Sequence, residues 1–215
     1  MSEAGKCPIC RSRSSTPYAE ISERRYFRCS TCHGVHVDSA HHLSDKAAIR
    51  HYLTHENDPS DAGYRRFLSR LADPMLERVA PGSHGLDYGC GPGPALAAML
   101  REAGHEMQVW DPFFAPDPAP LKATYDFITC TEVAEHFQTP AEEFDRLERL
   151  LAAGGWLGVM TSFLPEDAAF AGWYYHRDPT HIVFYAPETF TVIAAARGLS
   201  CEFPAPNVAL MRKVR

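Results

Sequence analysis

The segment 84–112, HGLDYGCGPGPALAAMLREAGHEMQVWDP, constrains the fold more than any other part of the chain. A short apolar stretch ends beside an aspartate, a glycine-rich turn and a helix-forming run follow, and a second apolar stretch also ends in an aspartate. Strand, turn, helix and strand in this order form half of a doubly wound α/β sheet. The residues that define the pattern are Asp87, Gly89, Gly91, Gly93 and Asp111. A chain of 215 residues can hold one such sheet and a small appendage.

The details of the glycine turn indicate its ligand. Glycines let the backbone approach a ligand closely at the carboxyl end of the first strand. Pro94 stands where a dinucleotide-binding turn needs a small residue, and Asp87 is better placed beside a cationic sulfonium or ammonium than beside a pyrophosphate. Asp111 can accept hydrogen bonds from both hydroxyls of a ribose. The pattern therefore favours S-adenosylmethionine over a nicotinamide dinucleotide.

Two Cys-x-x-Cys pairs in the first forty residues predict a metal site, because each pair lets two thiolates from one tight turn reach the same ion. Alternating stretches at 18–21 and 25–28 predict paired strands, and 34–38 predicts a third. Four soft thiolates favour zinc, and so short a segment needs a metal to fold. We expect a structural zinc ribbon, with a redox pair or an empty site as alternatives. The ligands are Cys7, Cys10, Cys29 and Cys32.

Five motifs then occur in order: Gly85–Gly93, Asp111, Tyr125–Ile128, Glu132–His136 and Leu150–Gly155. This series resembles that of the class I S-adenosylmethionine-dependent methyltransferases. The resemblance implies a Rossmann-like, doubly wound α/β sheet, mostly parallel with a reversed last strand. With the cysteine pairs and the segment WYYHRDPTHIVFYAPETF, the chain is similar to a bacterial subgroup related to quinone-type and sugar-type methyltransferases.

The resemblance also implies a place for each cofactor contact. The methionine part would lie along the first strand and the turn, the ribose on the acid that ends the second strand, and the adenine against the next two residues. Residues after the fourth strand would face the transferred methyl group. In chain order these contacts are Asp87, Gly89, Gly91, Gly93, Asp111, Pro112, Phe113, Thr131 and Glu132. The usual third strand is nearly absent, which leaves the partner of the adenine amino group unassigned.

Two segments offer groups for the proton of the methyl acceptor. The first segment has Glu132, Glu135 and His136 at i, i+3 and i+4, so we expect them on one helix face. There they bind a divalent ion, or else the glutamate caps the helix and the histidine only packs. The aromatic segment 161–185 is the other. In it His181 is the first candidate for a general base and His176 the second, unless the segment is only a turn.

The region between the ribbon and the glycine turn predicts two helices. Apolar residues recur there at helical spacings, and the helices either serve as scaffold or place Tyr52 and Tyr64 over a ligand pocket. We divide the chain into a zinc ribbon at 1–40, a helical linker or gate at 41–80 and a cofactor-binding domain at 81–215. The domain ends in a helix and strands at 200–203 and 208–213.

Net charge and hydropathy exclude some classes of binding partner. A formal charge of −6 argues against a nucleic-acid backbone as the partner. The sequence has no long apolar run and no signal pattern, so we expect a cytoplasmic protein that does not enter a membrane. The favoured function is methylation of an oxygen or nitrogen atom of a small molecule, with a protein partner possible at the ribbon. The alternatives are a non-catalytic module that binds S-adenosylmethionine and a nicotinamide-dependent oxidoreductase.

Overall fold

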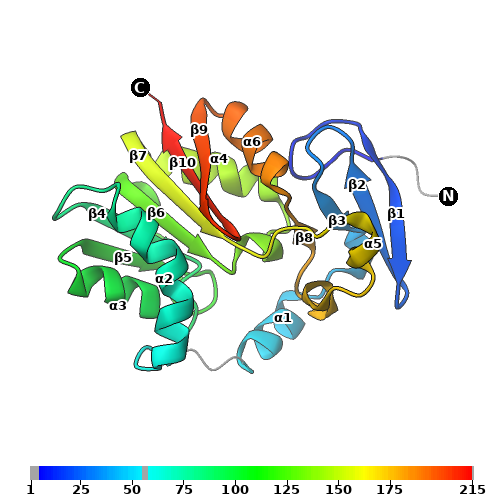
Figure 1. The fold of residues 1–215 in the computed structure, drawn as a ribbon. Coiled ribbons are helices and arrows are strands. Elements are labelled where there is room, and N and C mark those ends of the chain that lie inside the picture. The colour runs from blue at the N-terminus through cyan, green and yellow to red at the C-terminus, as the bar shows by residue number, and fades with distance from the viewer. Residues whose placement is uncertain (1–4, 55–57, 215) are drawn as a thin grey trace.

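The computed structural model describes residues 5–54 and 58–214, which form two sheets side by side (Figure 1). The larger sheet has six strands in the order β5-β4-β6-β7-β10-β9. These strands are β4 (His84–Tyr88), β5 (Glu106–Trp110), β6 (Tyr125–Thr131), β7 (Leu151–Met160), β9 (Leu199–Ala205) and β10 (Val208–Lys213). Strands β5, β4, β6 and β7 are parallel, whereas β10 is antiparallel to both β7 and β9. The expected doubly wound sheet with a reversed end is confirmed.

Helices cover both faces of this sheet (Figure 1). On one face are α2 (Ala62–Leu76) and α3 (Ala95–Glu102), and on the other are α4 (Pro140–Leu150) and α6 (Pro187–Ala195). Neighbouring residues of β6 alternate between the two cores, since Phe127 packs with α2 and α3 while Ile128 packs with α4 and α6. Between β5 and β6 the chain forms only the short 3-10 helix η2 (Ala119–Lys122), so β5 is an edge strand.

The smaller sheet contains the three strands predicted for the ribbon and a fourth that the sequence did not predict. Its order is β1 (Ser15–Ile21), β2 (Arg24–Cys29), β3 (Val35–Val37) and β8 (Val183–Phe184). Strand β8 comes from the aromatic segment of the larger domain and pairs antiparallel with β3, Val35 opposite Phe184. The ribbon sheet is therefore completed by residues far along the chain.

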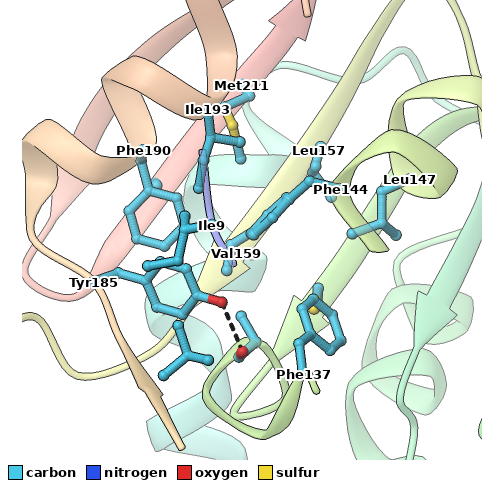
Figure 2. Close-up of a cluster of buried hydrophobic side chains, with 14 of the residues drawn as sticks. Ile9, Phe137, Phe144, Leu147, Leu157, Val159, Tyr185, Phe190, Ile193 and Met211 are labelled. Atoms are coloured by element: carbon cyan, nitrogen blue, oxygen red, sulfur yellow. Dashed lines mark hydrogen bonds between the residues drawn. The ribbon is translucent and has the colours of Figure 1, made fainter. Parts of the chain in front are cut away.

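The first cysteine turn also enters the core of the larger domain. The side chain of Ile9 lies among aromatic and aliphatic residues of β7, β10, α4 and α6, and none of it is exposed (Figure 2). Beside it the hydroxyl of Tyr185 donates to the carbonyl oxygen of Ala134 at 2.8 Å. The amide of Ala141, at the start of α4, donates to the carbonyl of Pro8 at 3.1 Å. One continuous hydrophobic core thus joins the ribbon to the sheet.

Short elements connect these parts. They are η1 (Ser39–His41), α1 (Asp45–Tyr52), η3 (Ala134–His136), α5 (Asp167–Phe170) and η4 (Tyr174–Arg177). Helices α1 and α2 confirm the two helices predicted before the glycine turn. Asp61 caps α2 by accepting a hydrogen bond from the amide of Tyr64, whereas the side chain of Ser44 at the start of α1 makes no capping bond. Among the described residues, no helix combines the length and the apolar character needed to cross a membrane.

Candidate active site

A cavity of about 860 Å³ opens at the carboxyl ends of β4, β5 and β6. This is where ligands bind in doubly wound sheets, and the volume lies in the upper part of the usual range for ligand sites. All nine predicted cofactor contacts line it: Asp87, Gly89, Gly91, Gly93, Asp111, Pro112, Phe113, Thr131 and Glu132. Tyr52 of α1 and Tyr64 of α2 line it as well. The helical linker therefore forms part of the cavity wall.

The glycine turn bends tightly over the end of β4. Gly89 and Gly91 have positive φ angles of 78° and 63°, which side-chain-bearing residues rarely adopt. A Cβ atom on Gly89 would lie 2.5 Å from Cγ2 of Val133, so the turn also needs glycine for space. The amides of Gly89 and Cys90 donate to the carbonyl of Trp110 at 2.7 and 3.2 Å. These bonds tie the turn to the end of β5.

Asp111 joins the glycine turn to the turn that follows β5. Its Oδ2 accepts from the amide of Gly91 at 3.0 Å, and its Oδ1 accepts from the amides of Phe113 and Phe114 at 2.8 and 3.0 Å. The side chain is buried at the cavity wall. Since a carboxylate offers about four acceptor positions, Oδ2 can still accept from a ligand hydroxyl.

Asp87 places a buried carboxyl group beneath the turn. Oδ1 accepts from the hydroxyl of Thr129 at 2.8 Å. Burial raises the pKa of Asp87 to about 6, and the hydrogen bond from Thr129 opposes this shift. A cationic ligand in the cavity would favour the carboxylate form. Asp87 is therefore suited to a ligand that carries a sulfonium or an ammonium group.

The carboxyl groups that follow β6 are arranged differently from the expectation. Glu132, Glu135 and His136 do not share a regular helix face, because Glu132 has a positive φ of 52° and only residues 134–136 form a 3-10 turn. The hydroxyl of Tyr175 lies 2.5 Å from Oε1 of Glu135 and 3.0 Å from Oε2 of Glu132. Burial, and then the charge of Glu135, raises the pKa of Glu132 to about 8. A protonated Glu132 can donate to the phenol oxygen while the phenol donates to Glu135.

Two histidines, His136 and His181, also line the cavity. Nδ1 of His181 lies 2.7 Å from the carbonyl oxygen of Tyr175, and Nδ1 of His136 lies 3.1 Å from that of Thr180. A carbonyl can only accept, so each Nδ1 carries a proton, and a ring in its neutral form has its lone pair on Nε2. Burial lowers the pKa of His181. The sequence could not predict that these rings lie 4.8 Å apart between centroids.

His176 lies elsewhere. Its ring packs against Tyr26 of β2 and Phe170 of α5, with centroid distances of 5.8 and 5.3 Å, and Nε2 lies 3.3 Å from the carbonyl of Ala171. It is not among the residues that line the described cavity. The structure thus separates the two histidines that the sequence placed together, and most aromatic residues around His176 pack on the ribbon.

Within the described part of the chain, two groups of side chains can hold a metal ion. Ligand atoms of Glu135, His136 and His181 lie within 4.8 Å of one another, and Oε2 of Glu135 is buried without a hydrogen-bond partner. His181 thus takes the place that the sequence assigned to Glu132. The four cysteine sulfurs form the other group. Two of their separations are 3.8 Å (Cys7 to Cys32) and 3.6 Å (Cys10 to Cys29), close to the edge of about 3.8 Å for a tetrahedron with zinc–sulfur bonds of about 2.3 Å.

Comparisons with known proteins place this site in context. The profile of a family described as a methyltransferase domain matches residues 49–202, more than half of the chain. No curated protein matches the sequence.

Two solved structures from Burkholderia thailandensis have a similar fold. One is a 1,6-didemethyltoxoflavin N1-methyltransferase with bound 1,6-didemethyltoxoflavin and S-adenosylhomocysteine; it is 14% identical, the match covers 93% of this chain and 99% of that chain, and the TM-score is 0.54. The other is an O-methyltransferase family protein that is 18% identical over 73% of this chain and 60% of that chain, with a TM-score of 0.51. At these identities the likeness concerns the fold.

Proposed function

Because the chain belongs to the methyltransferase-domain family and is an S-adenosylmethionine-dependent methyltransferase of class I, we propose that it methylates an oxygen or nitrogen atom of a small molecule. The observation that carries this proposal is the composition of one cavity. The nine predicted cofactor contacts line it together with His136 and His181, whose Nδ1 atoms donate to carbonyl oxygens and whose Nε2 atoms can accept a proton when the rings are neutral. We call the part around the glycine turn, Asp87 and Asp111 the cofactor half, and the part around His136 and His181 the acceptor half. An oxygen or nitrogen acceptor loses a proton during methylation, and such a histidine can accept it.

Each half of the cavity has its own task. S-adenosylmethionine, when bound, supplies a methyl group already activated on a sulfonium sulfur. In the cofactor half, Oδ2 of Asp111 would accept from a ribose hydroxyl, Asp87 would face the cationic part, and the glycine turn would lie against the methionine chain. Since the leaving group is activated, the protein must chiefly align the acceptor with the methyl–sulfur bond. We assign this alignment to the aromatic residues Tyr52, Tyr64 and Tyr174 in the wall.

In the acceptor half we assign proton removal to His181. Its Nε2 accepts the proton as the acceptor atom bonds to the methyl group, and the imidazolium that forms has Asp178 close by, with Oδ2 at 3.8 Å from Nε2. Burial would raise the pKa of Asp178, but bonds from Thr180 and the nearby His181 and His51 outweigh it and lower that pKa. Asp178 therefore stays charged and can stabilise a protonated His181.

We also propose that the four cysteines bind one structural zinc ion. The two sulfur separations fit a tetrahedral ion, and four protein ligands leave no position for a substrate. The ion would hold the two turns of the ribbon together and take no part in methyl transfer.

The first experiment is calorimetric titration of the purified protein with S-adenosylmethionine and S-adenosylhomocysteine, together with its zinc content by atomic emission. We expect micromolar binding and about one zinc per chain. A screen with methyl-labelled cofactor against phenols, alcohols and amines follows, and the labelled product identifies the methylated atom. Failure of a folded, zinc-loaded protein to bind the cofactor would remove the proposal. Tight binding without transfer to any acceptor would favour the non-catalytic alternative.

A further inference from the structure

A ribbon residue holds the chain segment that carries the proposed base. Nη1 of Arg24, at the start of β2, donates to the carbonyl oxygens of His176 and Asp178 at 3.0 and 3.3 Å. Nη2 donates to those of Pro179 and His181 at 3.5 and 2.8 Å. All four acceptors belong to the main chain. One guanidinium group therefore fixes the course of residues 176–181.

The same segment positions both histidines of the cavity. His181 lies at its end, with its own amide donating to the carbonyl of Asp178 at 3.2 Å. The carbonyl of Thr180, within the segment, accepts from Nδ1 of His136 and so sets the orientation of that ring. Any movement of the segment would change the direction of both Nε2 lone pairs.

Strand β3 continues this support beyond the segment. The amide of Val37 donates to the carbonyl of Ile182 at 2.8 Å, and the amide of Ile182 donates to the carbonyl of Glu135 at 2.9 Å. The β3–β8 pairing follows directly. A line of main-chain hydrogen bonds thus runs from the ribbon through Ile182 to the carboxyl cluster.

The cysteine cluster fixes the turn that connects these two supports. Strand β2, which carries Arg24, ends at Cys29, and β3 begins three residues after Cys32. The amide of Cys29 donates to the carbonyl of Gly34 at 3.0 Å across this turn. Residues 29 and 32 are two of the four proposed zinc ligands. The relative position of Arg24 and β3 therefore depends on the geometry of the cluster.

We propose that the zinc ribbon is the supporting wall of the acceptor half of the site, and that Arg24 is the residue that positions His181 and His136. That this half binds the methyl acceptor rests on the proposed function. That Arg24 holds residues 176–181 does not rest on it. The glycine turn and Asp111 are held without the ribbon, because their bonds join residues 89–114 to one another, and Asp87 is held by Thr129 of β6. Loss of the ribbon contacts should therefore disturb one half and leave the other intact.

The test compares Arg24→Ala with Arg25→Ala. Arg25 is the next residue of β2, but its side chain is 45% exposed and its ion pair with Asp38, at 2.7 Å, stays within the ribbon. Hydrogen exchange, measured by mass spectrometry on the zinc-loaded full chain, reports on peptides from 175–184 and 84–114. In Arg24→Ala we expect exchange about tenfold faster or more in 175–184, unchanged exchange in 84–114, and an affinity for S-adenosylhomocysteine within about twofold of the original. Arg25→Ala should match the unmodified protein.

A second readout separates positioning from general loss of stability. Millimolar methylguanidinium should restore slow exchange in 175–184 of Arg24→Ala, because it can occupy the vacated position, whereas sodium chloride at the same ionic strength should not. Unchanged exchange in the folded Arg24→Ala variant, equal acceleration in Arg25→Ala, or no recovery with methylguanidinium would each overturn the assignment of Arg24.

Removal of zinc tests the connection to the cysteines. After chelation we expect faster exchange in 175–184, while 84–114 stays protected and S-adenosylhomocysteine still binds. Slow exchange in 175–184 of the zinc-free chain would overturn the coupling, and a chain that unfolds completely without zinc would overturn the independence of the cofactor half. If the zinc-loaded protein does not bind S-adenosylhomocysteine at all, the proposed function fails while the exchange data still decide the role of Arg24.

Discussion

Nδ1 of His181 lies 2.7 Å from the carbonyl oxygen of Tyr175, which fixes the tautomer of the neutral imidazole with its lone pair on Nε2. The contact comes from the same turn that Arg24 holds. A histidine whose second nitrogen donates to a carbonyl is held in one ring orientation, and burial keeps it neutral at physiological pH by lowering its pKa. His181 is thus arranged to accept a proton rather than to donate one.

The first prediction concerns this ring. His181→Gln should decrease methyl transfer about 10²- to 10⁴-fold, the usual contribution of a general base, because the amide cannot accept the proton. The affinity for S-adenosylhomocysteine should not change. The measurement is the initial rate of label transfer to an acceptor found in the screen, with His176→Gln as the control that should retain activity.

A different result would reassign the cluster. If transfer requires added Mg²⁺ or Mn²⁺ even in the zinc-loaded protein, direct proton transfer to His181 is wrong. Glu135, His136 and His181 would then be metal ligands, as the proximity of their ligand atoms allows.

The second prediction concerns the ribose contact. Asp111→Asn should weaken cofactor binding about 10- to 100-fold, because the variant loses a charged acceptor and its amide nitrogen faces a backbone N–H. Calorimetry with S-adenosylhomocysteine measures the change. Asp117→Asn is the control, since Asp117 accepts only from the exposed turn amide of Ala119 at 2.9 Å. Unchanged binding in Asp111→Asn would show that the ribose is held elsewhere.

The third prediction is a pH dependence of cofactor affinity. The pKa of Asp87 is raised to about 6, so the group is largely protonated at pH 5 and ionised at pH 7. A cationic ligand favours the carboxylate, so binding releases a proton below pH 6 and the affinity rises with pH. We expect S-adenosylmethionine to bind about tenfold more weakly at pH 5 than at pH 7. Calorimetry in buffers of different ionisation enthalpy counts the released proton, and Asp87→Asn should abolish both effects.

The fourth prediction concerns the contact between the ribbon and the core. Ile9→Ala should decrease the free energy of unfolding by about 2–4 kcal/mol, because the side chain is fully buried and its removal leaves a cavity (Figure 2). Urea denaturation of the zinc-loaded protein measures it. Ile21, at the end of β1, is only partly buried, so Ile21→Ala removes the same atoms and should have a smaller effect. Equal losses in both variants would contradict the packing described here.

The cofactor half was predictable because each of its signals is local. The glycine turn, Asp87 and Asp111 lie within one strand–helix–strand unit, and short spacings determine which atoms meet there. The same holds for the cysteine pairs, whose two turns are brought together by the strands between them. In both cases a few residues along the chain fix the geometry.

The acceptor half could not be predicted in the same way. Spacing suggested a helix face for Glu132, Glu135 and His136, but the positive φ of Glu132 redirects its side chain. His181 joins the cluster from 45 residues farther along, through contacts that leave no periodic pattern. Arg24 is still farther in sequence from the segment that it holds. Such contacts are properties of the tertiary fold, and a single sequence carries no local sign of them.

The pairing of β3 with β8 has a consequence for the order in which the protein is made. The paired residues are about 150 positions apart, so their contact has a high sequence separation and forms slowly. At roughly 5–20 residues per second, a ribosome needs about 8 to 30 seconds to travel from one strand to the other. Throughout that time the open edge of β3 has no partner strand. The ribbon sheet, although its first three strands are synthesised early, is therefore completed only when β8 is made, and its exposed edge needs protection from aggregation until then.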